Sequence, residues 1–317
     1  MKRVPICEAL NADQYNNGNL HDYDPYMITD DGNVIDTDWY QSLSDNVKNR
    51  IRMPFDLKKV TIPHDVQVDN DDRFLATIHQ AYLDSFDYHV WFDNHLPMLS
   101  TNVSMIRITS LVKDTLLQMY TNRNNQCNHH MDKFKKQIED VLKSNAGGWF
   151  MRLSSTSGKN EDALEPLYTV DDVISRLVRI KLFVEKEYRR KKESYLILIP
   201  WHDDIEFDPQ YEWRVFVVNG KITAACPQRW FDIYQYSDDE LDMIEQALLT
   251  MPIDQFIYKT FIADVFIKNN TCYVIELNPF GAHCGAGSAL FNWVTDYDVL
   301  YGRHHQPELR YRSAIQY

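Results

Sequence analysis

The residues from Phe261 to Gly281 place two acids and an amide within two strands whose other side chains are almost all apolar. The acids are Asp264 and Glu276, and the amide is Asn278. An isolated carboxylate in such surroundings is costly unless it is paired, protonated or bound to a cation. Three oxygen-bearing side chains that converge on one face therefore favour a divalent cation, with magnesium as the first candidate.

The turn between these strands decides whether the three side chains share a face. A two-residue turn at Asn269-Asn270 would place Asp264 opposite Ile275, so that Asp264 and Glu276 would point to opposite faces. A three-residue loop over 269–271, with one asparagine left-handed, places Asp264 opposite Glu276 instead. The metal hypothesis therefore predicts the three-residue loop. The alternative is an ordinary hairpin with a solvated polar face.

Composition limits the class of protein and the kind of partner. The chain has 317 residues and 44% hydrophobic content, which is enough to bury a core in one large or two interlocked domains. Its formal net charge of -13 makes nucleic acid an unexpected partner and favours basic ones. Five scattered cysteines without a CxxC spacing favour a reducing compartment. With neither a signal peptide nor an apolar run of membrane-spanning length, a cytoplasmic location and no membrane partner are expected.

The order of the expected elements favours an α+β fold over a simple parallel Rossmann arrangement, because antiparallel hairpins interrupt the helices. Asn219-Gly220 is a strong turn signal, and Ser237 with Glu240 forms a capping box that opens a helix. Hydrophobic periodicity predicts the remaining elements. Helices are expected over 74–86, over 132–144 and from 169 onward, and strands over 58–68, 149–153, 195–201, 213–218 and 221–226.

A basic, hydroxyl-rich loop follows the strand predicted over 149–153, and phosphate binding needs such donors. The candidate donors are Arg152, Ser154, Ser155, Ser157 and Lys159. The loop is not a Walker A motif, because Leu153 stands where the first glycine should be and Asn160 follows the lysine. Serine-rich loops are also common as plain turns, so this segment counts only in combination with other motifs.

Arg214 lies inside a predicted strand, where its permanent charge needs a carboxylate or a phosphate. Gln228-Arg229 follows the same hairpin and offers further donors. The alternative for these arginines is a set of internal salt bridges, for which Glu212 is available. Cys127 and His129-His130 can ligate zinc, although no fourth ligand is spaced beside them.

Taken together, the motifs from about Trp149 to Trp293 resemble the cell division cycle protein 123 family, a divergent branch of the ATP-grasp fold. The motifs that carry the resemblance occur in order at 150–159, 196–201, 212–217, 228–234, 263–265, 275–281 and 290–293. The chain departs from the family at Glu276, where Asp is common, at Arg152, where Lys is common, and at Ile199-Pro200, where the hinge is often basic and polar. Residues 1–148 match only faintly, as a divergent N-terminal region and first lobe, and 302–317 do not match and are expected to form a C-terminal tail.

The resemblance implies an ATP and Mg²⁺ site over residues 149–301, with two lobes of largely antiparallel sheet that sandwich the nucleotide. The residues implied for ATP are Arg152, Ser154, Ser155, Ser157, Lys159, Leu198, Ile199, Trp201, Arg214, Gln228 and Arg229. The residues implied for the metal are Asp264, Glu276 and Asn278. Arg152 and Arg214 are expected to contact phosphate.

Members of the family assemble eukaryotic translation initiation factor 2 by binding its gamma subunit, so the resemblance implies an assembly chaperone with that partner. The wider fold implies an alternative, an ATP-dependent ligase or nucleotidyl transferase that forms an amide through an acyl phosphate or joins RNA ends. The sequence names neither a catalytic residue nor an acceptor substrate. Whether the protein is an enzyme is therefore left open.

Overall fold

The computed structural model describes residues 1–6, 83–92, 96–121, 129–155, 165–179, 194–203, 205, 208–230, 232–281, 286–293, 296–303 and 306–312. The chain divides into two compact units. The six-stranded unit comprises Met1–Phe86, Asp93–Leu99 and Asp204–Tyr317, and the three-stranded unit comprises Asp87–Phe92 and Ser100–Asp203. The strand predicted over 58–68 and most of the helix predicted over 74–86 lie outside the described residues.

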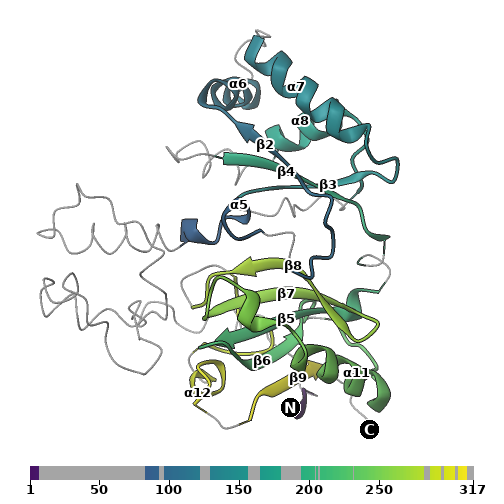
Figure 1. The fold of residues 1–317 in the computed structure, drawn as a ribbon, viewed down its shortest axis with the longest axis vertical. Helices are drawn as coiled ribbons and strands as arrows, with labels where there is room; N and C mark the ends of the chain where they lie inside the picture. The colour runs from purple at the N-terminus through teal and green to yellow at the C-terminus, as the bar shows by residue number, and fades with distance from the viewer. Residues whose placement is uncertain are drawn as a thin grey trace, which may run out of the picture. The chain divides into compact units, whose positions relative to one another are not determined.

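The three-stranded unit is an antiparallel sheet with the helices α6, α7 and α8 on one side of it (Figure 1). The strand order is β2-β4-β3, with β2 at Ser104–Ile108, β3 at Trp149–Leu153 and β4 at Ser194–Pro200. The helices are α5 at Tyr88–Trp91, α6 at Ser110–Tyr120, α7 at His129–Leu142 and α8 at Val170–Arg179. The strands predicted over 149–153 and 195–201 and the helix predicted over 132–144 are thereby confirmed to within a few residues at each end. The helix predicted from 169 is confirmed over Val170–Arg179, and residues 180–193, over which it was expected to continue, lie outside the described residues.

The core of this unit follows from the apolar spacing of its elements. In α7 the buried side chains are Met131, Phe134, Ile138 and Leu142, which recur every three or four residues and so form one apolar face. They belong to one buried cluster with alternate residues of the strands, among them Trp149, Met151, Leu153, Leu196 and Leu198. The opposite face of the sheet therefore carries the intervening residues of β3 and β4.

The six-stranded unit is a mixed sheet of order β1-β9-β6-β5-β7-β8. β1 and β9 pair in parallel, as do β9 and β6, and the other pairs are antiparallel. The strands are β1 at Lys2–Ile6, β5 at Glu212–Val218, β6 at Lys221–Pro227, β7 at Phe261–Lys268, β8 at Thr271–Asn278 and β9 at Glu308–Arg312. The helices are η3 at Pro209–Tyr211, α11 at Asp238–Leu249, η4 at Ile253–Gln255 and α12 at Tyr297–Leu300. Part of the expected C-terminal tail thus lies inside the sheet as β9.

Two local signals in this unit act as expected. Asn219 and Gly220 have φ values of 54° and 72°, the left-handed conformation that a tight hairpin turn needs. Ser237 and Glu240 form both hydrogen bonds of the capping box that starts α11. In the described residues of both units, no helix has the length and apolar character needed to cross a membrane.

The β7–β8 hairpin has the predicted pairing but not the predicted loop. Asn269 and Asn270 both have positive φ values, of 51° and 59°, and Lys268 pairs with Thr271, so the turn has two residues. The register shifts after Asp264, which pairs with Glu276 while Val265 pairs with Val274. Ile275 is therefore the extra residue of a β-bulge. The prediction that Asp264 lies opposite Glu276 is confirmed, and the three-residue loop is wrong, because the bulge supplies the change of register.

Candidate functional site

Strand register brings four polar side chains to one face of the six-stranded sheet. Arg214 of β5 lies directly opposite Asp264 of β7, which lies directly opposite Glu276 of β8. Asn278 lies two residues beyond Glu276 and pairs with Ile262, so it shares their face. Cys226 of β6 completes the row on the other side of Arg214. The acids and amide that the sequence singled out are therefore neighbours, and Arg214 joins them.

Asp264 is the centre of this cluster, because its carboxylate accepts hydrogen bonds from three side chains. Arg214 donates from Nε to Oδ1 at 2.9 Å and from Nη2 to Oδ2 at 3.0 Å, which is a bidentate pair. Gln228 Nε2 and Asn278 Nδ2 donate to Oδ2 at 3.3 and 3.2 Å. The partner of Arg214 is thus Asp264, rather than the Glu212 that the sequence offered as an alternative.

The ion pair at the centre of the cluster is buried, while Glu276 and Asn278 are half-buried. Asp264 is 2% exposed and Arg214 is 8% exposed. Burial acts to lower the pKa of Arg214, but the charge and hydrogen bonds of Asp264 outweigh burial, and the net shift of the pKa is upward. Burial raises the pKa of the neighbouring Cys226 thiol to about 12, so this thiol is protonated at neutral pH. Arg214 therefore remains a full positive charge although its side chain is buried.

A short segment of chain also holds Arg214. Its Nη1 donates to the backbone oxygen of Gly287 at 3.2 Å and to that of Ala286. Gly287 has a φ of +74°, a conformation that side chains with a Cβ rarely adopt. The guanidinium is thus fixed on one edge by a carboxylate and on the other by two carbonyl groups.

The residues of this cluster fit a divalent cation by their donor chemistry. Across the described residues, no group of three or more His, Cys, Asp and Glu side chains is placed to hold a metal ion. The predicted site instead combines two carboxylates with an amide, and Asn278 donates through its nitrogen, which leaves its side-chain oxygen as the ligand atom. The side-chain oxygen of Gln228 is buried without a hydrogen-bond partner, so it can accept a bond from a metal-bound water. A cation that binds Asp264 must compete with Arg214.

The predicted phosphate residues of β3 lie in the three-stranded unit. Arg152 is 4% exposed, donates from Nε to the Leu153 backbone oxygen at 3.3 Å and stands 4.9 Å from the centre of the Tyr88 ring. Ser154 is buried, and its hydroxyl oxygen accepts a bond from the Tyr195 amide at 3.0 Å. Ser154 therefore joins the end of β3 to β4, and its hydroxyl hydrogen can still be donated to an anionic ligand. Ser155 is half-buried.

The expected adenine-binding strand is β4. Leu198 is fully buried in the core beneath the helices, so its side chain does not reach the other face of the sheet. Ile199 is half-buried and, as the next residue, points to that other face. The amide of Trp201 donates to the Gly148 oxygen at 3.1 Å, and its indole donates to Asp203 at 2.8 Å. Neither Pro200 nor Trp201 therefore has a backbone N–H to offer a base.

The other predicted residues are placed as follows. Arg229 is half-buried just after β6. Ser157 and Lys159 lie outside the described residues, as does Cys127 of the possible zinc set. His129 and His130 begin α7, with ring centres 6.0 Å apart.

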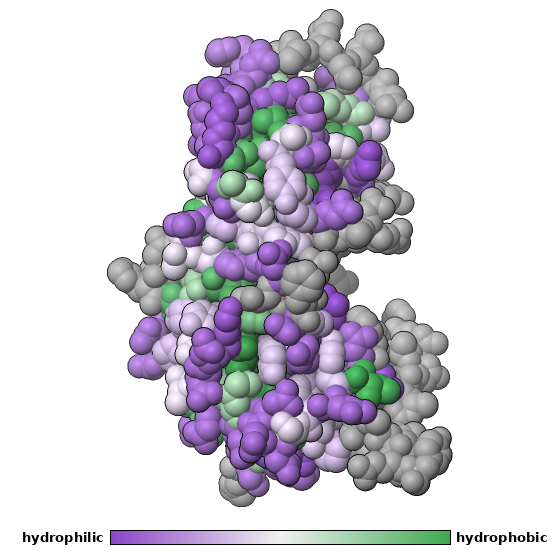
Figure 2. Space-filling view, turned by 90° about the vertical axis from the view of Figure 1, so that its right-hand side faces the viewer, coloured by the Kyte–Doolittle hydropathy of each residue, from purple (hydrophilic) through white to green (hydrophobic). Residues whose placement is uncertain are grey.

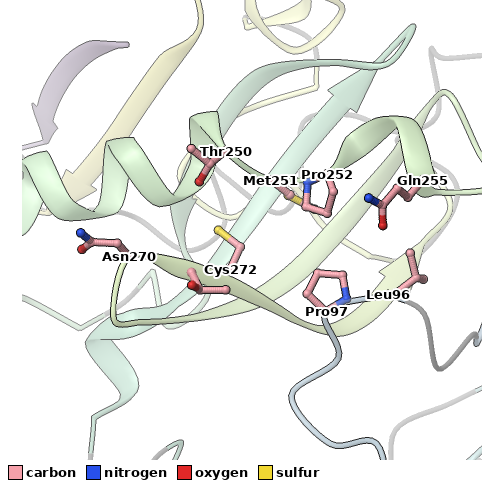
Figure 3. Close-up of a pocket in the computed structure, with 9 residues that line it drawn as sticks. Leu96, Pro97, Thr250, Met251, Pro252, Gln255, Asn270 and Cys272 are labelled. Carbon is pink, nitrogen blue, oxygen red and sulfur yellow. The ribbon is translucent and has the colours of Figure 1, made fainter.

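A separate hollow of about 390 Å³ lies at the β8 edge of the six-stranded unit (Figure 3). It contains none of the residues predicted for ATP or metal. Its lining residues are Leu96, Pro97, Thr250, Met251, Pro252, Gln255, Asn270, Thr271 and Cys272. Burial raises the pKa of Cys272 to about 12, so its thiol is also neutral.

The sequence did not identify Arg310 and Asp296, which form hydrogen bonds to Leu290 and Asn292, close to the Ala286 and Gly287 carbonyl groups that contact Arg214. Arg310 forms two bonds of 2.7 Å to the carboxylate of Asp296 and one of 2.7 Å to Glu308. The available signal was the alternation of Glu308 and Arg310 within a short strand-like run, which places both side chains on one face. That signal lay in the expected tail.

Comparison with known proteins supports the resemblance. A family model described as D123 matches residues 169–314. "Cell division cycle protein 123" of Candida glabrata is 32% identical over 115 residues, which cover 34% of this chain and 31% of that protein. "Translation initiation factor eIF2 assembly protein" of Candida albicans is 28% identical over 135 residues, which cover 39% of this chain and 37% of that protein.

A solved structure shows the same fold at low identity. The structure of Cdc123 from Schizosaccharomyces pombe superposes with a TM-score of 0.56 at 18% sequence identity, over 74% of this chain and 97% of that one. The matched part of this chain spans only 31% and 37% of the length of the two curated relatives. The family model, the curated relatives and the fold agree that this chain is similar to the cell division cycle protein 123 family.

Proposed function

We propose that this protein binds ATP with Mg²⁺ and acts as an assembly factor for translation initiation factor eIF2, through the gamma subunit of that factor. The observation that carries the nucleotide part is the juxtaposition of the buried Asp264 and Arg214 with the half-buried Glu276 on one face of the sheet. The partner is suggested by the name of the relative from Candida albicans, an eIF2 assembly protein, which this chain matches over only part of its length.

The charges of the cluster suit a cation together with a polyanion. Asp264, Glu276 and Asn278 would hold the metal through oxygen atoms. Arg214 would then share Asp264 with a second positive charge, which is unfavourable unless an anion is added. Bound Mg²⁺-ATP supplies both the cation and the negative phosphates. Some of the N–H groups of the Arg214 guanidinium can then donate to phosphate oxygens instead of to Asp264. The planar guanidinium group suits this bidentate contact.

The first test replaces Asp264 with asparagine, which keeps the shape of the side chain but removes its charge. We expect ATP to bind at least tenfold more weakly, about 1.4 kcal/mol, because the metal loses a charged ligand. Calorimetric titration with ATP in the presence of Mg²⁺ measures this change. Chelation of the metal should weaken binding to the wild-type protein by a similar factor and have less effect on the variant.

Asp254→Asn is the matched control, because Asp254 is an exposed acid of η4 in the same unit and its change removes the same charge. Its affinity for ATP should equal that of the wild type within twofold. Equal affinities for wild type and Asp264→Asn, or no effect of the chelator, would show that Asp264 is not a metal ligand.

The second test concerns the partner. The face in Figure 2 is largely hydrophilic, with apolar residues in small patches, and the net charge is -13. Such a surface favours recognition of a basic protein surface over an extended nucleic-acid footprint. We expect the protein to co-elute with purified eIF2 gamma subunit at low salt in the presence of Mg²⁺-ATP, with negligible turnover of labelled ATP.

The same incubation, repeated with RNA of defined ends, separates the assembly factor from the alternative enzyme. A labelled adenylate on protein or RNA, or a joined RNA product, would support an ATP-dependent ligase instead. Absence of co-elution at both low and high salt would contradict the gamma-subunit assignment, whatever the result for ATP.

A further inference from the structure

The segment 286–292 is held at each end by a different arginine. At its start, Arg214 binds the backbone oxygens of Ala286 and Gly287. Near its end, Arg310 of β9 donates from Nη1 to the Leu290 oxygen at 3.1 Å, and its guanidinium carbon stands 4.2 Å from the centre of the Phe291 ring. The backbone of the segment is therefore held in position by two different arginine side chains, one near each end.

Asp296 closes this end of the segment. It receives two bonds of 2.7 Å from Arg310, and its Oδ2 also accepts the amide of Asn292 at 2.8 Å. The amide of Asp296 in turn donates to the Asn292 oxygen at 2.9 Å. Arg310, Asp296 and Asn292 thus form a small network with charge-assisted bonds, and the Arg310 and Asp296 side chains are only 12% and 18% exposed.

The residues between the two ends of the segment are tightly folded, so a movement at the Arg310 end is passed on to the Arg214 end. Ser288 accepts the amide of Phe291 at 3.0 Å through its backbone oxygen and donates its hydroxyl to the Phe291 oxygen. Ala289 has a φ of 50°, and Ala289, Leu290 and Phe291 are all at most 3% exposed. A displaced Phe291 would therefore also displace the carbonyl groups that meet Arg214.

We infer that Arg310 and Asp296 are positioning residues that set the direction of Arg214, and thereby the balance between its bonds to Asp264 and to a ligand phosphate. Without Arg310, the segment loses the Leu290 bond, the Phe291 contact and the fixed position of Asp296. The backbone oxygens of Ala286 and Gly287, which accept bonds from Arg214, are then no longer held in position. The consequence for ATP rests on the proposed function, whereas the coupling between the two arginines does not.

The experiment compares Arg310→Gln and Arg310→Lys with Arg303→Gln. Arg303 is a matched control because it also pairs with an aspartate, Asp298 at 3.5 Å, and lies over an aromatic ring, Tyr297 at 4.7 Å, but it is exposed and both of these partners lie outside the segment. Side-chain N–H exchange of Arg214 is measured by NMR in the absence of nucleotide. We expect exchange at least tenfold faster in Arg310→Gln, an intermediate change in Arg310→Lys, and a change of less than twofold in Arg303→Gln.

Two further measurements separate positioning from general destabilisation. Amides of the β5–β7 ladder should exchange as in the wild type in Arg310→Gln, while the Phe291 and Asn292 amides should exchange faster. The Kd for Mg²⁺-ATP should rise at least fivefold. If Arg310→Gln does not fold, Asp296→Asn carries the same comparison, since it removes the charge but keeps an acceptor for Asn292.

The outcomes distinguish the two proposals. Wild-type exchange of the Arg214 side chain in a folded variant would overturn the positioning role, as would faster exchange spread evenly over the sheet. Faster exchange confined to Arg214 and the segment, in a protein that does not bind Mg²⁺-ATP, would keep the positioning role and refute the proposed nucleotide function.

Discussion

Replacement of Asp264 with alanine is expected to lower the free energy of unfolding of the six-stranded unit by about 3–5 kcal/mol, because it leaves Arg214 as a buried charge without a carboxylate. The change also removes the acceptor of Gln228 and Asn278. Exchange of the β5 and β7 amides at rising urea concentrations measures the loss for this unit.

The control removes both charges at once. In Asp264→Leu with Arg214→Met, neither member of this buried ion pair remains, so stability should lie within about 2 kcal/mol of the wild type even though more polar contacts are lost. A double variant as unstable as the alanine variant would show that the unpaired charge is not the cause. Binding of Mg²⁺-ATP should be absent in both variants, because each lacks the proposed metal ligand.

The second large effect is expected at Gly148, just before β3. This residue has a φ of +86°, and a Cβ added there would lie 2.6 Å from Pro166 Cβ and 3.0 Å from the Tyr168 ring. Alanine at this position combines left-handed strain with overpacking, so we expect Gly148→Ala to destabilise the three-stranded unit by about 2–4 kcal/mol. Exchange of the β3 and β4 amides at rising urea concentrations measures the change for this unit alone.

Gly147 provides a control one residue away. A Cβ there would meet its nearest atom, Asn145 Oδ1, at 3.4 Å, and the residue is exposed. Gly147→Ala should therefore change stability by less than about 0.5 kcal/mol. Similar losses for the two variants would indicate that flexibility of the glycine pair, rather than the conformation of Gly148, determines stability.

Local signals allowed much of the fold to be predicted. The bounds of β3 and the Asn219-Gly220 turn follow from short-range patterns, and so does the capping box of Ser237. These features depend on residues within a few positions of one another. Periodicity also identified α7, since its buried residues lie on one face.

The candidate site could be predicted only in part, because its contacts join distant residues. The sequence indicated that Arg214 needs an anion, but Asp264, its partner, is fifty positions further along the chain. The roles of Arg310 and the 286–292 segment depend on the pairing of β9 with β6, which local composition does not specify. The three-residue loop was predicted because a bulge and a longer turn have the same effect on strand parity.

The bulge at Ile275 has a consequence for how this hairpin can vary among related chains. What the site requires is the pairing of Asp264 with Glu276, not a particular turn, because a two-residue turn with one bulge residue gives the same pairing as a three-residue turn without a bulge. A shortened turn can be tolerated if a bulge appears elsewhere in the hairpin, and a lost bulge if the turn gains one residue. Alignments of this hairpin should therefore show compensating single-residue gaps on either side of the turn, while the spacing of Glu276 and Asn278 stays fixed.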